Sequence, residues 1–225
     1  LAALCAERGV PLVVDAAQGA GSVALSMREL PAVRFICAPG HKGLYGPQGT
    51  GVLLCRDADA GTLLEGGTGS DSRSPEQPAF LPDRFEAGTL NAAGIAGLRE
   101  GVRFVLRQGV SRILAHERAL IACAARELSR VPGVRVCGDG GPHQAGVLSF
   151  RADGLPCEAL AQSLAAGGVA VRAGLHCAPL AHRTAGTLES GTVRVSVSAF
   201  SSESDVEALV RGVRAALRHG RGQNG

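Results

Sequence analysis

The sequence predicts an α/β fold in which a mainly parallel or mixed sheet is followed by a small α+β unit. Three short apolar runs, VPLVVD, VRFICA and TGVLLC, lie within residues 10–55 and alternate with helical or Gly-rich segments. Runs of this length and β-branched content are typical of strands that are buried on both faces. Their alternation with helices and loops favours an α/β layer.

The composition and the hydrophobic pattern change over the rest of the chain. Residues 56–90 are rich in Gly, Ser, Pro and Asp, which predicts a long functional loop. Helical periodicity covers 91–130, with a break near Gly109–Ser111 after which Ser111 is a candidate cap. Short strands VRVC, GVLSF, GVAVR and TVRVSVS then alternate with helices around 156–166 and 203–218. We therefore expect one domain over 1–108, a small C-terminal domain with its linking helix over 109–219, and a disordered tail over 220–225.

Composition excludes several classes of protein. Charged residues make up 19% of the chain and the net charge is only +3, without the clustered basic patch that nucleic-acid binding requires. No apolar run approaches the ~20 residues of a membrane span, so we expect neither a membrane-spanning helix nor a signal peptide in this sequence. Seven widely spaced Cys, an odd number, predict free thiols in a reducing cytoplasm. Because Leu1 lies inside a helical pattern, we also expect an N-terminal portion upstream.

Two charged residues follow predicted strands. Asp15 ends the first strand, and Lys42 lies beside His41 in a Gly-flanked turn after the second. Strand ends face the ligand crevice in α/β sheets, so both side chains are candidates for a site. Taken singly, Asp15 is more often a cap of the next helix and Lys42 a solvated loop residue. Only the combination with other motifs decides between these readings.

Five segments spread over almost the whole chain carry the motifs of one family. They are VVDAAQGAG, GHKGLYGPQGTGVLL, FLPDRFEAGTLNAAGIAGL and the pair VRAGLHCAPLAH and GTVRVSVSAF. In their order and spacing they resemble the class V aminotransferases, and the cysteine desulfurase family in particular. The resemblance implies a pyridoxal 5'-phosphate (PLP)-dependent transferase of fold type I. Residues 1–108 would complete the PLP-binding domain, and the active site would lie between the domains at a homodimer interface.

The resemblance also implies roles for five residues around the cofactor. Lys42 binds PLP covalently and transfers protons, while Asp15 pairs with the pyridinium nitrogen. Gln18 donates to the phenolic oxygen of the ring, and His41 contacts the phosphate. Thr89 reaches the phosphate of the neighbouring subunit. Amine, carboxylate, amide, imidazole and hydroxyl groups are the types that such a cofactor requires.

Two further residues are assigned to the substrate. Period-two alternation places Arg194 on the polar face of its strand, where a solvent-facing role is the plain alternative; by resemblance it clamps the substrate carboxylate. Cys177 taken alone is more often a buried structural thiol, but by resemblance it forms a persulfide with sulfur from L-cysteine, and alanine is released. A metal site built from His176, Cys177 and His182 is disfavoured, so no metal is expected.

Other readings remain open beside the desulfurase. A selenocysteine lyase, an aminotransferase or an epimerase of the same family would keep PLP and change the substrate. An inactive fragment would lack the upstream part of the site. One departure from the family is Pro39, which replaces the usual Ser or Thr three residues before the lysine and supplies neither a hydroxyl nor an N–H group. A protein that accepts the sulfur is a further expected partner.

Overall fold

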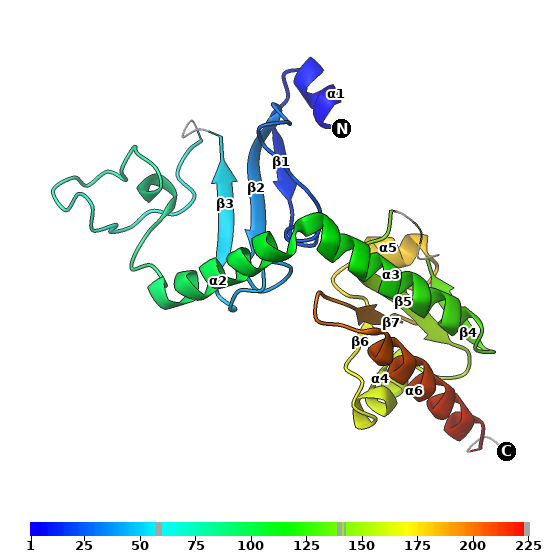
Figure 1. Ribbon diagram of the computed structural model, residues 1–225. Coiled ribbons are helices and arrows are strands. Elements are labelled where there is room, and N and C mark those ends of the chain that lie inside the picture. The colour runs from blue at the N-terminus through cyan, green and yellow to red at the C-terminus, as the bar shows by residue number, and fades with distance from the viewer. Residues whose placement is uncertain (57–59, 139–140, 142, 223–225) are drawn as a thin grey trace. The chain divides into compact units, whose positions relative to one another are not determined.

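A computed structural model describes residues 1–56, 60–138, 141 and 143–222, and it divides the chain into two compact units (Figure 1). The first unit comprises Leu1–Ser111 and the second Arg112–Gly225. Each unit has a sheet and a hydrophobic core of its own. Among the described residues, no helix combines the length and apolar character that crossing a membrane requires.

The first unit is built on a mixed three-stranded sheet, as the sequence predicts. After the short helix α1 (Ala2–Glu7), strand β1 (Leu12–Asp15) runs parallel to β2 (Val33–Pro39), with Asp15 opposite Cys37. Strand β3 (Gly51–Cys55) returns antiparallel to β2. Because β1 and β2 are parallel neighbours, their carboxyl ends meet at the same edge of the sheet.

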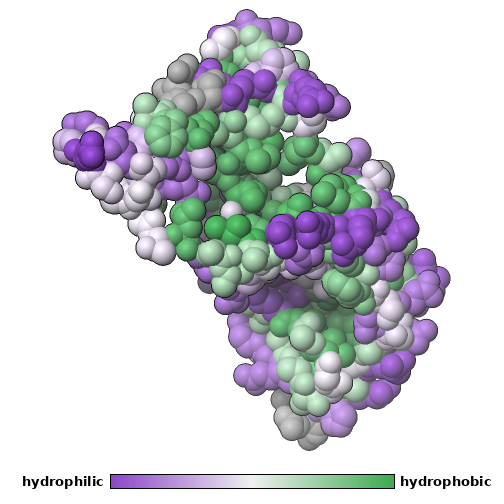
Figure 2. All heavy atoms as spheres, turned by 60° about the vertical axis from the view of Figure 1, so that its left-hand side comes forward, coloured by the Kyte–Doolittle hydropathy of each residue, from purple (hydrophilic) through white to green (hydrophobic). Residues whose placement is uncertain are grey.

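The core of the first unit lies on one face of this sheet. Ala16, Val33, Ile36 and Ala38 are buried, and Leu12 packs against them. The expectation that the first strand is buried on both faces is wrong for the described chain, because Val13 is 60% exposed. Side chains alternate between the two faces of a strand, so Val13, which follows the core-facing Leu12, points to the opposite face. Figure 2 shows hydrophobic residues at the surface of the molecule.

The segment between β3 and the next helix is irregular, as expected, but it is tied together internally. Its single described helical turn is η1 (Asp83–Phe85). The Arg84 guanidinium donates to the Ala60 carbonyl oxygen at 2.9 and 3.1 Å. The Gln77 amide donates to the carbonyl oxygens of Asp83 and Glu86 at 2.8 and 3.0 Å. These bonds define the path of the loop toward residue 89.

Two long helices follow, separated at Gly109 as the periodicity predicts. Helix α2 (Ala92–Gln108) begins at Asn91, whose side-chain oxygen accepts from the Gly94 N–H at 3.0 Å. It ends at Gly109, which adopts a φ of 85° that glycine tolerates best. Helix α3 (Val110–Ser129) starts directly afterwards, so Ser111 lies inside the helix and is not its cap.

The second unit is a four-stranded antiparallel sheet with helices. Its elements after α3 are β4 (Val134–Cys137), β5 (Val147–Ala152), α4 (Cys157–Ala166), β6 (Arg172–Gly174), α5 (Pro179–Thr184), β7 (Thr192–Ser196) and α6 (Glu203–Gly222). The strand order is β4-β5-β7-β6.

Two boundaries in the second unit differ from the sequence prediction. The strand expected at GVAVR lies later, because Gly168 turns the chain with a φ of 81° and only residues 172–174 pair with β7. Helix α6 continues into the expected tail as far as Gly222; residues 223–225 lie outside the described part.

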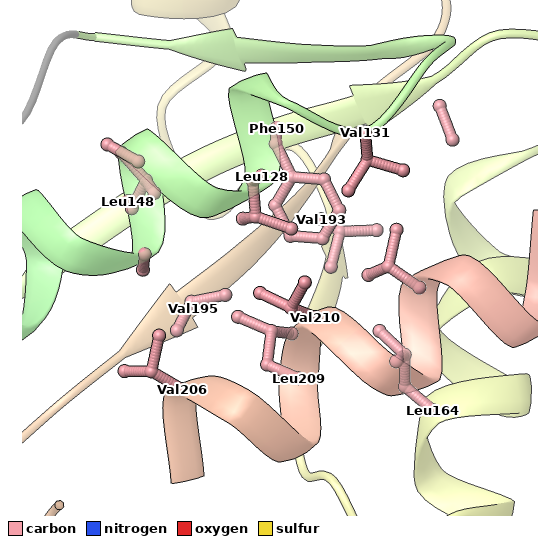
Figure 3. Close-up of a cluster of buried hydrophobic side chains, with 14 of the residues drawn as sticks. Leu128, Val131, Leu148, Phe150, Leu164, Val193, Val195, Val206, Leu209 and Val210 are labelled. Carbon is pink, nitrogen blue, oxygen red and sulfur yellow. The ribbon is translucent and has the colours of Figure 1, made fainter. Parts of the chain in front are cut away.

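The two faces of the second sheet have opposite characters. One face carries Leu148, Phe150, Val193 and Val195, which pack with side chains of α3, α4 and α6 in the main core (Figure 3). The opposite face carries polar residues of the same strands, among them Arg194, which pairs with Ser149 on β5 and Arg172 on β6. The apolar face anchors the strands, and the polar face is left to line a site.

Candidate active site

Asp15 and Gln18 lie at and just beyond the carboxyl end of β1. Asp15 is the last residue of the strand, and its side-chain oxygen accepts from the Ala17 N–H at 2.8 Å. The segment that follows is a turn rather than a helix, with Gly19 N–H bonded to the Ala16 carbonyl at 3.1 Å. Asp15 therefore does not cap a helix; it fixes a turn that leaves Gln18 exposed.

His41 and Lys42 lie in the connection between β2 and β3. The ladder closes this connection where Pro39 pairs with Gly51, and Gly40 and Thr50 share a further backbone bond of 2.8 Å. The Lys42 carbonyl accepts from the Tyr45 N–H at 2.9 Å. Both His41 and Lys42 are exposed. The lysine amine is thus presented on a closed, hydrogen-bonded loop and is accessible to a small molecule.

A pair of glycines joins the two loops. A Cβ atom on Gly21 would collide with the carbonyl oxygen of Gly43, and one on Gly43 would collide with the carbonyl oxygen of Ala20. Only residues without side chains permit this approach of backbone to backbone. The structure therefore brings the segment of Asp15 and Gln18 against the loop of His41 and Lys42. Sequence reasoning did not single out these glycines, although both lie inside the motifs that it used.

Helix α2 also packs against the lysine loop. The Gly101 backbone lies so close to Leu44 that a Cβ would collide with the Leu44 carbonyl oxygen and lie 2.7 Å from the Tyr45 carbonyl carbon. The ring of Phe104 packs edge-on against the Tyr45 ring, with centroids 5.1 Å apart. Lys42 is thus held by a loop that is packed between helix and turn.

Thr89 stands apart from these contacts. It is exposed, two residues before the helix cap Asn91, and no hydrogen bond among the described residues connects it to Asp15 or Lys42. The preceding Gly88 N–H donates to the Gly67 carbonyl at 2.9 Å, which links the Thr89 segment to the Gly-rich stretch of the long loop.

In the second unit, Cys177 lies between β6 and α5. Its side chain is exposed, and both His176 and Cys177 adopt the left-handed backbone region, with φ values of 53° and 62°. The His176 Nε2 atom lies 3.1 Å from both the carbonyl and the hydroxyl oxygen of Thr192 on β7. The segment of Cys177 is thereby joined to the strand that carries Arg194.

Arg194 and His176 line a cavity of about 350 Å³ over the polar face of the second sheet. Its wall also includes Cys137, Ser149, Thr192 and the buried His182, whose Nδ1 lies 2.8 Å from the Thr187 hydroxyl. Two of the atoms here are buried without a partner among the described residues: Arg194 Nε and His176 Nδ1. A guanidinium with an unused, buried donor in the wall of a cavity is suited to binding a carboxylate.

Two groups in this cavity have shifted acidities. Burial lowers the pKa of His176, and the nearby Arg194 guanidinium lowers it further. Burial also raises the pKa of the Cys137 thiol, partly offset by Arg151. Both shifts favour neutral side chains, so near pH 7 the arginine is the cationic group that a carboxylate would meet.

Comparison with known proteins identifies the family. The family profile described as aminotransferase class V matches residues 1–209. The chain belongs to this family. Its α/β architecture, with a mixed sheet in one unit and an antiparallel sheet in the other, is consistent with part of a PLP-dependent fold type I enzyme, as the sequence predicts.

The relatives found are cysteine desulfurases. The chain is 36% identical over 213 residues to "Cysteine desulfurase" of Synechococcus elongatus, covering 92% of this chain and 33% of the relative. It is 35% identical over 223 residues to "Probable cysteine desulfurase 2" of Mycobacterium leprae, covering 96% and 52%. The chain thus spans between a third and about half of these relatives.

Solved structures of cysteine desulfurases are also similar to this chain. The cysteine desulfurase CsdA of Escherichia coli, in its S-sulfonic acid form, superposes with a TM-score of 0.84 at 31% identity. The alignment covers 96% of this chain and 54% of that one. Apo cysteine desulfurase from Thermococcus onnurineus gives 0.79 at 30% identity, with 97% and 55% covered. At this identity the likeness includes the sequence as well as the fold.

Proposed function

We propose that the protein is a PLP-dependent cysteine desulfurase, which converts L-cysteine to L-alanine and holds the sulfur as a persulfide on Cys177. The observation that carries the proposal is the contact between Gly21 and Gly43, because it brings the carboxylate of Asp15 and the amine of Lys42 to one edge of the sheet. The names of the relatives and of the solved structures support the same substrate.

The donor set fits the cofactor. Asp15 would accept from the protonated ring nitrogen, Gln18 would donate to the ring oxygen and His41 to the phosphate, and Lys42 would bind the aldehyde carbon. When bound, PLP withdraws electrons from the substrate carbon atoms. Pro39 supplies no donor to the phosphate, so His41 and backbone N–H groups of the loop must serve instead.

The other residues act on the substrate. Arg194 would hold the carboxylate, and the Lys42 amine would move a proton at the substrate carbon. The Cys177 thiolate would bond to the substrate sulfur as the carbon–sulfur bond breaks. The carbon skeleton keeps that electron pair, takes up a proton and leaves as alanine. Cys177 is exposed, which this attack requires.

The proposal also covers the compartment of the enzyme, its oligomeric state and its partner. We place it in the cytoplasm as a homodimer in which Thr89 reaches the phosphate of the neighbouring subunit, and we expect a protein that accepts the sulfur. The resemblance to the family supports these points. Sedimentation of the PLP-loaded protein should give the mass of a dimer, and a monomer would contradict the role of Thr89.

Trapping the cofactor tests the central assignment. The chain is incubated with PLP and reduced with borohydride, and the labelled peptide is mapped by mass spectrometry. We expect the label on Lys42, and its loss in Lys42→Ala. Arg34→Ala serves as a control on the same strand-and-loop element and should keep the label. Lys42 is the one lysine of the given sequence, so a label on the N-terminal amine alone, or none on Lys42 even with upstream sequence supplied, would exclude the PLP assignment.

A further inference from the structure

His176 makes the contact that joins the Cys177 segment to strand β7. Its Nε2 atom lies 3.1 Å from the carbonyl oxygen of Thr192, and a carbonyl oxygen can only accept. The hydrogen of the imidazole must therefore be on Nε2, which donates to Thr192. Thr192 is 1% exposed and pairs with Gly174 on β6, so the acceptor is fixed in the sheet.

The segment that this bond holds is unfavourable on its own. His176 and Cys177 are two consecutive residues with side chains, and both have positive φ values, of 53° and 62°. Residues other than glycine rarely adopt this region, so surrounding contacts must hold them in it. The local backbone contributes one bond, from the Ala178 N–H to the Leu175 carbonyl at 2.9 Å. The imidazole of His176 supplies the long-range contact.

We propose that His176 is a positioning residue. Its Nε2–H bond to Thr192 on β7 holds Cys177 in place relative to Arg194, which lies on the same strand as Thr192. The inference rests on the proposed function, because it gives the position of Cys177 a purpose. Thr192 and Arg194 are two residues apart on β7 and share a face of the sheet. The anchor of the nucleophile and the clamp for the substrate carboxylate are thus neighbours on one rigid element.

The charge state of His176 suits this role. Burial and then Arg194 lower its pKa, the hydrogen bond to Thr192 partly opposes them, and His182 and Arg172 lower it further, so the ring stays neutral near pH 7. A neutral ring with its hydrogen on Nε2 leaves Nδ1 as an acceptor, and Nδ1 lies buried at the cavity. The ring therefore anchors the loop without adding a second positive charge beside Arg194.

A matched pair of variants separates the effect of losing the hydrogen bond to Thr192 from the effect of removing the imidazole ring. His176→Gln places an amide N–H where Nε2 lies, whereas His176→Asn has a shorter side chain that cannot reach Thr192. Hydrogen exchange of the 175–182 peptide is followed by mass spectrometry in the 225-residue chain. We expect exchange in His176→Asn to be at least about 10-fold faster than in the wild type, and His176→Gln to stay within about 3-fold.

Turnover of L-cysteine to alanine is then measured with PLP. We expect His176→Asn to lower kcat by about 10- to 100-fold with KM within about 3-fold, and His176→Gln to restore most of kcat. Equal exchange in all three proteins, or equal kcat losses in Asn and Gln, would overturn the proposal. If the wild type forms no alanine even with upstream sequence supplied, the proposed function fails instead, and the exchange data alone decide whether His176 holds the segment.

Discussion

Glu117 is a carboxylate enclosed by the second unit. It lies on α3 with 7% of its surface exposed, and a Cβ on Gly146 would lie 2.8 Å from its Oε2 atom. Burial raises the pKa of Glu117, and the neighbouring His116 lowers it to a smaller degree. Because the folded-state pKa lies above the unfolded value, folding favours the protonated form. The contribution of Glu117 to the free energy of unfolding is therefore fully present below its unfolded-state pKa. It is lost as the pH rises through its folded-state pKa.

Glu117→Gln should therefore raise the melting temperature near pH 7, by about 2 °C or more, since an ionised carboxylate no longer has to be buried. The gain should vanish near pH 4. Glu127→Gln on the same helix is the control of opposite sign, because its hydrogen bond with Arg126 lowers the pKa of Glu127. Calorimetry from pH 4 to 8 checks both variants. A melting temperature of Glu117→Gln below that of the wild type at pH 7 would contradict this account.

Cys137 lines the same cavity as Arg194, and Cys177 follows His176, which lines it too. Cys177 is exposed, whereas Cys137 lines the cavity and its pKa is raised by burial, which disfavours the thiolate. We predict that Cys177→Ser reduces alanine formation from L-cysteine by at least about 100-fold and that Cys137→Ser stays within about 3-fold. Product analysis by mass spectrometry measures both. Sulfur release that survives in Cys177→Ser would remove the assigned role and favour another enzyme of the family.

Among elements, helix α2 has a direct effect on the lysine loop. The Gly101 backbone touches Leu44 and Tyr45, whereas a Cβ on Gly97 would meet only ring carbons of Pro47 at 3.2 Å. Alanine is the better helix former by about 1 kcal/mol, so Gly97→Ala should be neutral or mildly stabilising. Gly101→Ala must displace backbone atoms of the loop.

We predict that Gly101→Ala lowers the rate of borohydride-trapped PLP labelling of Lys42 by at least about 10-fold and lowers the melting temperature, while Gly97→Ala changes neither by much. Both variants carry the same chemical change on the same helix, so the comparison isolates the contact with the loop. Labelling of Gly101→Ala at the wild-type rate, with an unchanged melting temperature, would show that the loop does not depend on this approach.

Most of the helices and strands could be predicted from hydrophobic periodicity. The predictions that failed did so for local reasons. The three strands of the first unit and the break at Gly109 are confirmed, because apolar runs and a helix-ending glycine act over short distances. The strand expected at GVAVR is displaced because a positive φ at Gly168 reorients the chain before pairing can begin. The turn after Asp15 replaces a possible helix because its side chain bonds the Ala17 N–H.

At the scale of the whole molecule, the site was only partly predictable. Strand ends place Asp15 and Lys42 at one edge, which follows from parallel pairing of β1 and β2. The approach of Gly21 to Gly43 and the bond from His176 to Thr192 join segments that are distant in sequence. Such contacts depend on tertiary packing, which no local pattern encodes. Motif matches could name the residues, but only the fold shows what holds them.

The two units differ in how much core they contain. Among the described residues, the main buried cluster of the first unit comprises Ala16, Val33, Ile36 and Ala38, whereas that of the second has 19 residues, all from α3, α4, α6 and the sheet except Val131. Buried apolar area is the main stabilising term in folding, so the first unit should have the lower free energy of unfolding.

Hydrogen exchange along a urea titration should therefore show the first unit opening at lower urea than the second, in two steps rather than one. Added PLP should shift only the first step, because Lys42, Asp15, Gln18 and His41 all belong to that unit. At a free concentration of 100 times its Kd, the stabilisation should be about 2.7 kcal/mol, and Lys42→Ala should reduce it. Coincident opening of both units would show that they unfold cooperatively despite their separate cores, and a PLP shift confined to the second step would place the cofactor away from Lys42.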